Sequence, residues 1–402
     1  MKIGIVSLNF GWQAGGNRQI LELTRNLKKM GHAVTIYAPE ANKGAFSSLQ
    51  EGLSVSVVPV KESVSWNYSP AGLVSKIFYK LHQYRTQKEI CRAIAARIDK
   101  DLDVINCHDY SYPVNYFYKI VNPSVRAVTT MCEPPYSYLP KKGFLVDIAS
   151  RAYNWLLDLF ERKYLLAADV VATTAPYEKE WIERRGGKGV VVWSGLNFER
   201  FYAPPRRYPK DKIFKLFAIG IPSPYRRYED ATYAVAALRK EGYDVRLTVV
   251  ANNLWREDEY CEKLKKIVRD GNLGKYVHLR FDGVSEEELK NLYKTSHVFV
   301  YTNYVPPGRN GATWALVVSE AQAAGMPVVL YKNTGAAEPL TDGENAMLAE
   351  TLDKDDVARK IKMLIDNPKL YKKIARGGQE FVRNNISWQK YTERMLKLFN
   401  GV

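Results

Sequence analysis

Residues that build metal and disulfide centres are scarce in this sequence of 402 residues. Its four cysteines stand far apart and include no Cys-x-x-Cys pair, which excludes a zinc module and a disulfide framework. Its five histidines are equally scattered along the chain. The sequence therefore predicts no metal site.

Long apolar runs are also missing. The longest, such as VVATTA and HVFVY, fall far short of the roughly 18 residues that a membrane-spanning helix needs. The opening segment, MKIGIVSLNFGW, has too short an apolar stretch for a signal peptide and predicts a first strand instead. We therefore expect a cytoplasmic protein.

Acidic residues are outnumbered, which gives the chain a net charge of +16. Residues 1–200 hold 26 Lys+Arg and 18 Asp+Glu, and the rest holds 33 and 25, so each half has an excess of +8. Nucleic acid, anionic lipid and phosphorylated substrates all suit that sign, as does a plain solvated surface.

Apolar strand-like segments alternate with helical segments in two successive sets. This alternation is typical of parallel, doubly wound sheets, whose ligands bind at the carboxyl ends of the strands. The prolines and charges of NFERFYAPPRRYPKDK interrupt the pattern. We predict an α/β protein with two Rossmann-like domains facing across a cleft. The first domain is predicted to span 1–202, the linker 203–211 and the second domain 212–385, and a further helix lies in 386–402.

Two amphipathic, aromatic and basic segments exceed what a plain Rossmann domain needs. They span 69–98 and 139–165, and Lys141 and Lys142 precede the second predicted helix. Helices that cover the core are one interpretation. A surface that docks on anionic lipid, at the inner face of the membrane, is the other.

Glycine-containing loops follow the first strand of each predicted domain. Gly15 and Gly16 open a helix without the spacing of a dinucleotide or P-loop motif, but their amides suit a phosphate or a sugar. Gly220 ends a strand, and Arg226 and Arg227 follow before a helix. A guanidinium group there can grip a diphosphate. A structural turn and a solvated arginine pair remain the alternatives.

A helix predicted to begin near Trp314 carries a single carboxylate, Glu320. Its first-turn amides would come from Ala315, Leu316 and Val317, and unpaired amides at a helix start hold phosphate without a cation. Glu320 lies one turn beyond Leu316, where its carboxylate can accept both hydroxyls of a ribose. The segment, with Thr313 before it, predicts a nucleotide site.

Taken in order, these motifs resemble the GT-B glycosyltransferases of the large retaining family 4. The matching segments are GWQAGGN, WSGLNFERF, GIPSPYRRYED, SEAQAAGMPVV, TGAAEPLTDGENAMLA and ISWQKYTERMLKLF. The similarity covers nearly the whole chain, is strong from Val298 to Leu348 and is weak from about residue 51 to 100. It implies that the N-terminal domain, 1–202, binds the acceptor and that the C-terminal domain, 212–385, binds a nucleotide-sugar donor, UDP- or GDP-linked, as substrate. It also implies that the helix in 386–402 returns to the first domain, and it implies no separate cofactor.

In the donor site, the resemblance implies that Glu320 binds the donor ribose. Ala312 occupies the position of a second family acid that is placed near the transferred sugar, so this carboxylate is missing. Arg226 aligns with the family's phosphate-gripping lysine. Ile221 replaces a further cation of the family, for which Arg227 is the candidate substitute.

Two further residues are predicted near the chemistry. Cys132 falls where relatives often carry a histidine beside the donor sugar, and His108 ends a strand at the presumed cleft. A histidine satisfied by backbone groups is the alternative for His108. No strand ends in the Asp-x-Asp of a metal-dependent GT-A enzyme, so we expect no metal.

The sequence thus predicts a retaining glycosyltransferase that moves a sugar to a glycan, a lipid-linked acceptor or another hydroxyl. A non-catalytic sugar-nucleotide-binding protein is the alternative from another class, and the missing acid at Ala312 favours it. A GT-B epimerase or phosphorylase is a further one. Nucleic acid is disfavoured as a partner, because the aromatic residues are not spaced as stacking platforms.

Overall fold

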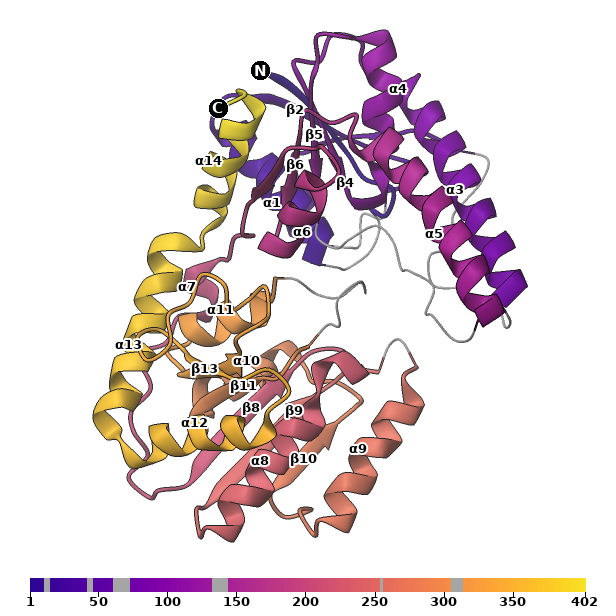
Figure 1. Cartoon of the computed structure of the whole chain (residues 1–402). Helices are drawn as coiled ribbons and strands as arrows, with labels where there is room; N and C mark the ends of the chain where they lie inside the picture. Colours follow the sequence, from indigo (N-terminus) through magenta and orange to yellow (C-terminus); the bar gives the residue numbers. More distant parts are fainter. Residues whose placement is uncertain (11–14, 42–45, 61–72, 132–143, 254–255, 305–313) are drawn as a thin grey trace. The chain divides into compact units, whose positions relative to one another are not determined.

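The structure, a computed structural model, describes residues 1–10, 15–41, 46–60, 73–131, 144–253, 256–304 and 314–402 (Figure 1). These residues form two compact units. Unit 1 comprises the described residues of 1–195 together with Trp388–Val402, and unit 2 comprises those from Leu196 to Ser387.

Unit 1 is built on a parallel sheet. Among the described residues its strands are, in spatial order, β3 (Ser54–Val57), β2 (Ala33–Ala38), β1 (Lys2–Val6), β4 (Val104–His108), β5 (Arg126–Thr130), β6 (Val170–Thr173) and β7 (Gly189–Val191). The register of β1 pairs Ile3 with Val34 on one side and with Val104 on the other. The central strands are almost continuously buried, as expected for a parallel sheet with helices on both faces.

The helices of unit 1 lie between and beside these strands. They are α1 (Gly15–Lys29), α2 (Ser47–Gln50), α3 (Leu73–Ala95), α4 (Pro113–Val121), α5 (Phe144–Leu165), α6 (Pro176–Glu183) and α14 (Trp388–Phe399). The last of them comes from the far end of the chain. Its buried Trp388, Tyr391 and Met395 share one core with Ile20 and Leu23 of α1.

Unit 2 repeats the architecture. Its sheet contains, in spatial order, β10 (Val277–Arg280), β9 (Val245–Val250), β8 (Phe214–Ile219), β11 (Val298–Tyr301), β12 (Val328–Tyr331) and β13 (Met347–Ala349). Its helices are α7 (Phe198–Phe201), α8 (Tyr228–Lys240), α9 (Asp258–Asp270), α10 (Glu286–Thr295), α11 (Leu316–Ala323), α12 (Lys354–Asp366) and α13 (Pro368–Asn385). The prediction of two Rossmann-like domains is confirmed.

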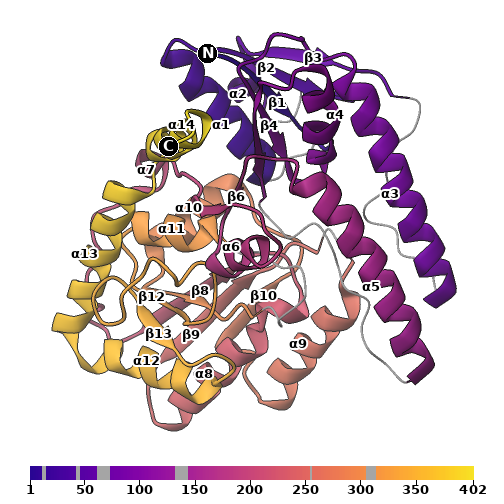
Figure 2. The same cartoon turned by 45° about the horizontal axis from the view of Figure 1, so that its top comes forward.

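Helices α3 and α5 extend beyond the residues through which they contact the core. Both views show them side by side (Figures 1 and 2), and Tyr84 packs against Phe160 with ring centroids 5.0 Å apart. Ile90 and Ile94 of α3 are buried, whereas Phe78 is 69% exposed and Trp155 of α5 is 62% exposed. Only part of each helix therefore covers the core, and the interpretation of the two segments as core-covering helices applies to that part.

The chain passes from unit 1 to unit 2 at Gly195–Leu196, before the predicted linker. The residues predicted as linker are fastened within unit 2. The Arg206 guanidinium donates to the carbonyls of Tyr293 and Ala324, and the Tyr208 ring packs edge-on against Phe214. Proline and charge mark an irregular segment in the sequence, but these anchors could not be read from composition.

An ion pair fixes the start of α8. Arg227 adopts a left-handed conformation, with φ of 50°, and its Nε and Nη2 donate to the two oxygens of Asp230 at 2.6 and 2.9 Å. The Tyr331 hydroxyl, at the end of β12, donates to the same carboxylate at 2.6 Å. Because Asp230 is buried, its charge depends on these partners.

We expect Arg227→Ala to lower the free energy of unfolding by about 3 kcal/mol, because it leaves a buried carboxylate without its cation. Urea-induced unfolding measures this change. Arg246→Ala is the matched control, since Arg246 pairs with Asp244 at the surface and contributes less than about 1 kcal/mol. Equal destabilisation by the two variants would contradict the structural role of Arg227.

Candidate functional site

The sheet of unit 2 changes its winding direction between β8 and β11. Strand β8 pairs with β9 on one side and β11 on the other, so the loops that follow β8 and β11 diverge. Doubly wound sheets bind ligands at this switch point, beyond the carboxyl ends of the strands. Gly220 follows β8 there, and Tyr301 ends β11.

Gly220 leaves room for two side chains over the backbone. A Cβ atom at this position would lie 3.0 Å from the Tyr228 hydroxyl oxygen and 3.2 Å from the guanidinium carbon of Arg226. A glycine therefore lets Arg226 fold back over the end of β8. The sequence predicted both Gly220 and Arg226 at this place, and the structure brings them together.

Arg226 is oriented across the switch point. Its Nη1 donates to the Tyr301 hydroxyl at 2.8 Å, which ties the loop after β8 to the end of β11. The Thr302 hydroxyl lies 3.0 and 2.9 Å from the carbonyl oxygens of Arg226 and Arg227 and fixes the backbone of the same loop. The arginine that faces Gly220 is thus held at both its backbone and its guanidinium.

Arg227 has a different role from Arg226. Its two donors to Asp230 commit it to the start of α8. The hydrogen bonds and the proximity of Asp230 raise the pKa of Arg227 further above its already high value, so it remains a cation whose charge is balanced within unit 2. Arg226, bonded to a neutral hydroxyl, keeps its charge unbalanced by that contact.

Helix α11 follows β11 and begins two residues later than predicted. Ala315 is its N-cap, so Leu316 and Val317 provide first-turn amides, while the amide of Val318 donates to the carbonyl of Ala315. Glu320 lies one turn into this helix and is partly buried. The Tyr293 hydroxyl of α10 donates to Glu320 Oε2 at 2.7 Å.

Unit 1 has its own switch point, between β1 and β4. Gly15 and Gly16 open α1 after β1, and His108 ends β4, so the structure brings these predicted residues to one edge of the sheet. Asp109 follows in a left-handed conformation, with φ of 47°. A Cβ atom at Gly16 would lie 3.5 Å from its Oδ2, so Asp109 also faces the glycine loop.

His108 is buried and belongs to a polar chain. The Asn106 side-chain amide lies 3.1 Å from His108 Nε2, and the Thr130 hydroxyl lies 2.9 Å from Asn106 Oδ1. Burial lowers the pKa of His108 to about 3. The imidazole is therefore neutral at physiological pH and can exchange hydrogen bonds with a ligand but not supply a positive charge.

Some predicted site residues carry no structural description. Cys132 and Thr313 lie outside the described residues, as does Ala312. Trp314 is the residue two positions before α11. Within the described ranges, no cluster of three or more His, Cys, Asp and Glu side chains could hold a metal ion. Over the same ranges, no helix is long and apolar enough to cross a membrane.

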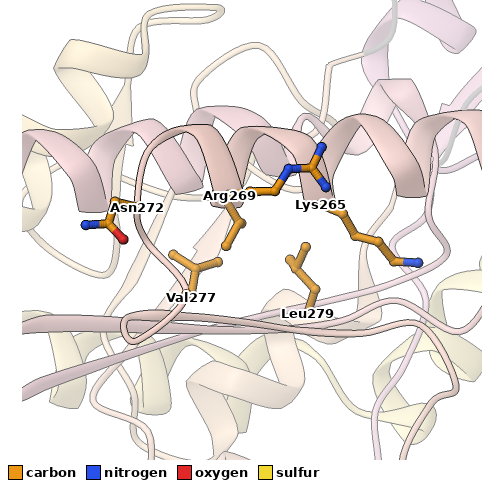
Figure 3. A pocket seen from close by; sticks show the side chains of 7 residues that line it. Lys265, Arg269, Asn272, Val277 and Leu279 are labelled. Carbon is orange, nitrogen blue, oxygen red and sulfur yellow. The ribbon is translucent and has the colours of Figure 1, made fainter.

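A surface pocket of about 430 Å³ lies elsewhere in unit 2, between α9 and β10 (Figure 3). Its lining consists of Lys265, Val268, Arg269, Asn272, Gly274, Val277 and Leu279. None of the predicted site residues is among them. The predicted residues Gly220, Arg226 and Glu320 lie instead around the switch point.

The tyrosines that orient Arg226 and Glu320 were not predicted from the sequence. Tyr293 and Tyr301 both occur in the segment NLYKTSHVFVYTN, where a polar ring near the end of α10 and another at the end of the buried strand β11 are the available signal. That signal shows only that a hydroxyl needs a partner. It does not show which charged residue the fold will bring to it.

Two family models match the chain. Residues 205–381 match "Glycosyl transferases group 1", and residues 14–192 match "Glycosyl transferase 4-like domain". A D-inositol 3-phosphate glycosyltransferase from Streptomyces avermitilis is 28% identical over 63% of this chain and 55% of its own length. A GDP-mannose-dependent alpha-(1-6)-phosphatidylinositol monomannoside mannosyltransferase from Mycolicibacterium smegmatis is 26% identical over 42% of this chain and 43% of its own.

The chain spans about half the length of these curated relatives. The fold is similar to that of the Anabaena protein HepE, solved in complex with UDP. The superposition covers all of both chains, with a TM-score of 0.71 at 16% sequence identity. The two family models divide the chain much as the two sheets do. The protein therefore belongs to the group 1 glycosyltransferases and has the GT-B fold.

Proposed function

We propose that the chain transfers a sugar from a nucleotide-sugar donor to a hydroxyl acceptor, with retention of the anomeric configuration and without a metal ion. The observation that carries this proposal is that two charged side chains, each oriented by a tyrosine, lie at the switch point of unit 2. Arg226 is oriented by Tyr301, and Glu320 is oriented by Tyr293. A cation for a diphosphate and a carboxylate for a ribose are the two groups that a nucleotide sugar requires.

In the proposed reaction the acceptor oxygen bonds to the anomeric carbon on the face from which the diphosphate leaves. The acceptor proton passes to an oxygen of that phosphate, and the bond between the anomeric carbon and the phosphate oxygen breaks. Arg226 and the first-turn amides of α11 stabilise the charge that develops on the leaving group. His108, neutral in unit 1, exchanges hydrogen bonds without changing charge.

Two alternatives predict different products. A protein that only binds sugar nucleotides leaves the donor intact when an acceptor is added. A GT-B phosphorylase releases a sugar phosphate when orthophosphate is supplied, and an epimerase returns an altered sugar nucleotide. Incubation of UDP- and GDP-sugars with and without orthophosphate, followed by product analysis, separates these outcomes from transfer to an acceptor.

The ribose assignment is tested by Glu320→Gln, which keeps an acceptor for the Tyr293 hydroxyl but removes the charge. Loss of a charge-assisted hydrogen bond predicts an affinity for the nucleoside diphosphate that is weaker by roughly tenfold to a hundredfold, or about 1.5–3 kcal/mol. Titration calorimetry with UDP and GDP measures the affinity. An unchanged affinity, with the fold intact, would refute the assignment.

The diphosphate assignment is tested by Arg226→Ala. A group that meets charge appearing on the leaving diphosphate contributes more in the transition state than in the ground state. We therefore expect a large fall in kcat, roughly a hundredfold or more for a lost oxyanion donor, and a smaller change in KM. A variant with normal kcat and a raised KM would show that Arg226 serves binding alone.

We propose, as part of the same function, a lipid-linked acceptor that unit 1 reaches from an anionic membrane surface. Helices α3 and α5 expose Phe78 and Trp155, aromatic side chains of the kind that insert at a membrane interface. From Lys80 onward, helix α3 also carries four basic residues and a single acid: Lys80, Arg85, Lys88 and Arg92 against Glu89. This surface combines the charge and the apolar groups that anionic headgroups and their acyl boundary require.

Vesicles of phosphatidylglycerol should bind the protein at low salt and release it as salt rises, because charges are screened within about 10 Å at 0.1 M. Vesicles of phosphatidylcholine should bind it weakly. Trp155→Ser should weaken binding several-fold, whereas Ile120→Ser, which changes a 68% exposed residue of α4, should not. Flotation assays measure both. Absence of binding to phosphatidylglycerol at low salt would rule out the docking surface and point to a soluble acceptor.

A further inference from the structure

Glu320 is held by a rigid neighbour before any ligand arrives. The Tyr293 hydroxyl donates to Glu320 Oε2 at 2.7 Å, and Tyr293 is 2% exposed. Its ring meets Phe217 and Phe201 edge-on, with centroid distances of 5.3 and 5.7 Å. These contacts leave the ring no room to swing, so the hydroxyl is a fixed point for the carboxylate.

The backbone of Tyr293 is fixed as well. Its carbonyl accepts a hydrogen bond of 2.6 Å from Arg206 Nη2, whose guanidinium also reaches the carbonyl of Ala324 at the end of α11. Arg206 therefore ties the last turn of α10 to the helix that carries Glu320. The helix that carries the Tyr293 hydroxyl and the helix that carries the Glu320 carboxylate are therefore joined by the Arg206 guanidinium.

The hydrogen bond has a defined direction. Burial, reinforced by the Glu320 carboxylate, raises the pKa of Tyr293 well above its usual range, so the hydroxyl keeps its proton and donates it. A carboxylate has about four acceptor positions. Tyr293 occupies one of these positions, on Oε2.

Holding the carboxylate in advance affects selectivity. A glutamate side chain loses rotamer freedom when it binds a ligand, and this loss weakens the binding unless the side chain is already ordered. An ordered carboxylate can also meet two vicinal hydroxyls together, whereas a mobile one adjusts to a single hydroxyl. The orientation of Glu320 therefore affects how much affinity is lost when the nucleotide lacks its 2′-hydroxyl.

We propose that Tyr293 is a positioning residue that orients Glu320 and thereby sets the discrimination between ribonucleotides and 2′-deoxyribonucleotides at the donor site. The proposal rests on the proposed function, in which Glu320 binds the donor ribose. Tyr293 makes no contact with the ligand itself and acts through the carboxylate alone. Its effect must therefore vanish when Glu320 is changed.

The test compares the dissociation constants of UDP and 2′-deoxy-UDP, and of the corresponding guanosine pair, by titration calorimetry. For the unmodified protein we expect the ribonucleotide to bind about tenfold or more tightly, as the loss of one charge-assisted hydrogen bond requires. Tyr293→Phe keeps the ring and removes the hydroxyl. We expect it to lower this ratio several-fold, mainly by weakening the ribonucleotide.

Tyr371→Phe is the matched control, because the buried Tyr371 hydroxyl of α13 donates to the His297 carbonyl at 2.8 Å and is also a tyrosine of unit 2. It loses one buried hydrogen bond, as Tyr293→Phe does, and should leave the ratio unchanged. In the double variant Tyr293→Phe/Glu320→Gln, the ratio should equal that of Glu320→Gln alone. This comparison separates positioning from a general loss of stability.

Two results would overturn the inference in different ways. If Tyr293→Phe keeps the ratio of the unmodified protein while Glu320→Gln loses it, Tyr293 does not position the carboxylate, and the proposed function stands. If the unmodified protein shows no preference for ribonucleotides, Glu320 does not bind the ribose. The ribose assignment within the proposed function then fails together with the inference.

Discussion

A parallel sheet buried on both faces is the constraint from which the rest of the structure follows. In β11, Val298 and Val300 enter one core while Phe299 and Tyr301 enter the opposite one, so unit 2 needs helices on both sides. Helices can cover both faces only if the crossovers reverse direction along the sheet. That reversal parts the loops after β8 and β11, where Gly220 and Arg226 meet without disturbing either core.

Charged side chains in unit 2 are held in two distinct ways. The Asp230 carboxylate is paired with the Arg227 cation, and this pair balances its own charge. Arg226 and Glu320 are held by hydroxyls, from Tyr301 and Tyr293, which orient them without cancelling their charge. A tyrosine suits this task because its ring has only two torsions and its oxygen is neutral.

The sequence allowed the fold to be predicted because buried strands and amphipathic helices leave a periodic signal. It also placed Glu320 and Arg226 correctly on a helix after one strand and a loop after another. What it could not supply were contacts between distant positions. Tyr293 reaches Glu320 across 27 residues, and the Gly195–Leu196 crossing depends on packing that composition does not record. Likewise, Phe78 is apolar enough for a core position, but it is exposed because only part of α3 covers the core.

The net charge of +16 and the oriented Arg226 cation at the switch point act over different distances. A surface excess of Lys and Arg raises the local concentration of anionic substrates, but salt screens it within about 10 Å. It therefore affects the rate of encounter more than the selectivity of binding. Selectivity depends on groups that are partly buried and held in place, where screening is weak. Arg226 and Glu320 are oriented by the neighbouring Tyr301 and Tyr293, so under the proposed function a change in salt and a change in those tyrosines should affect different steps of donor binding.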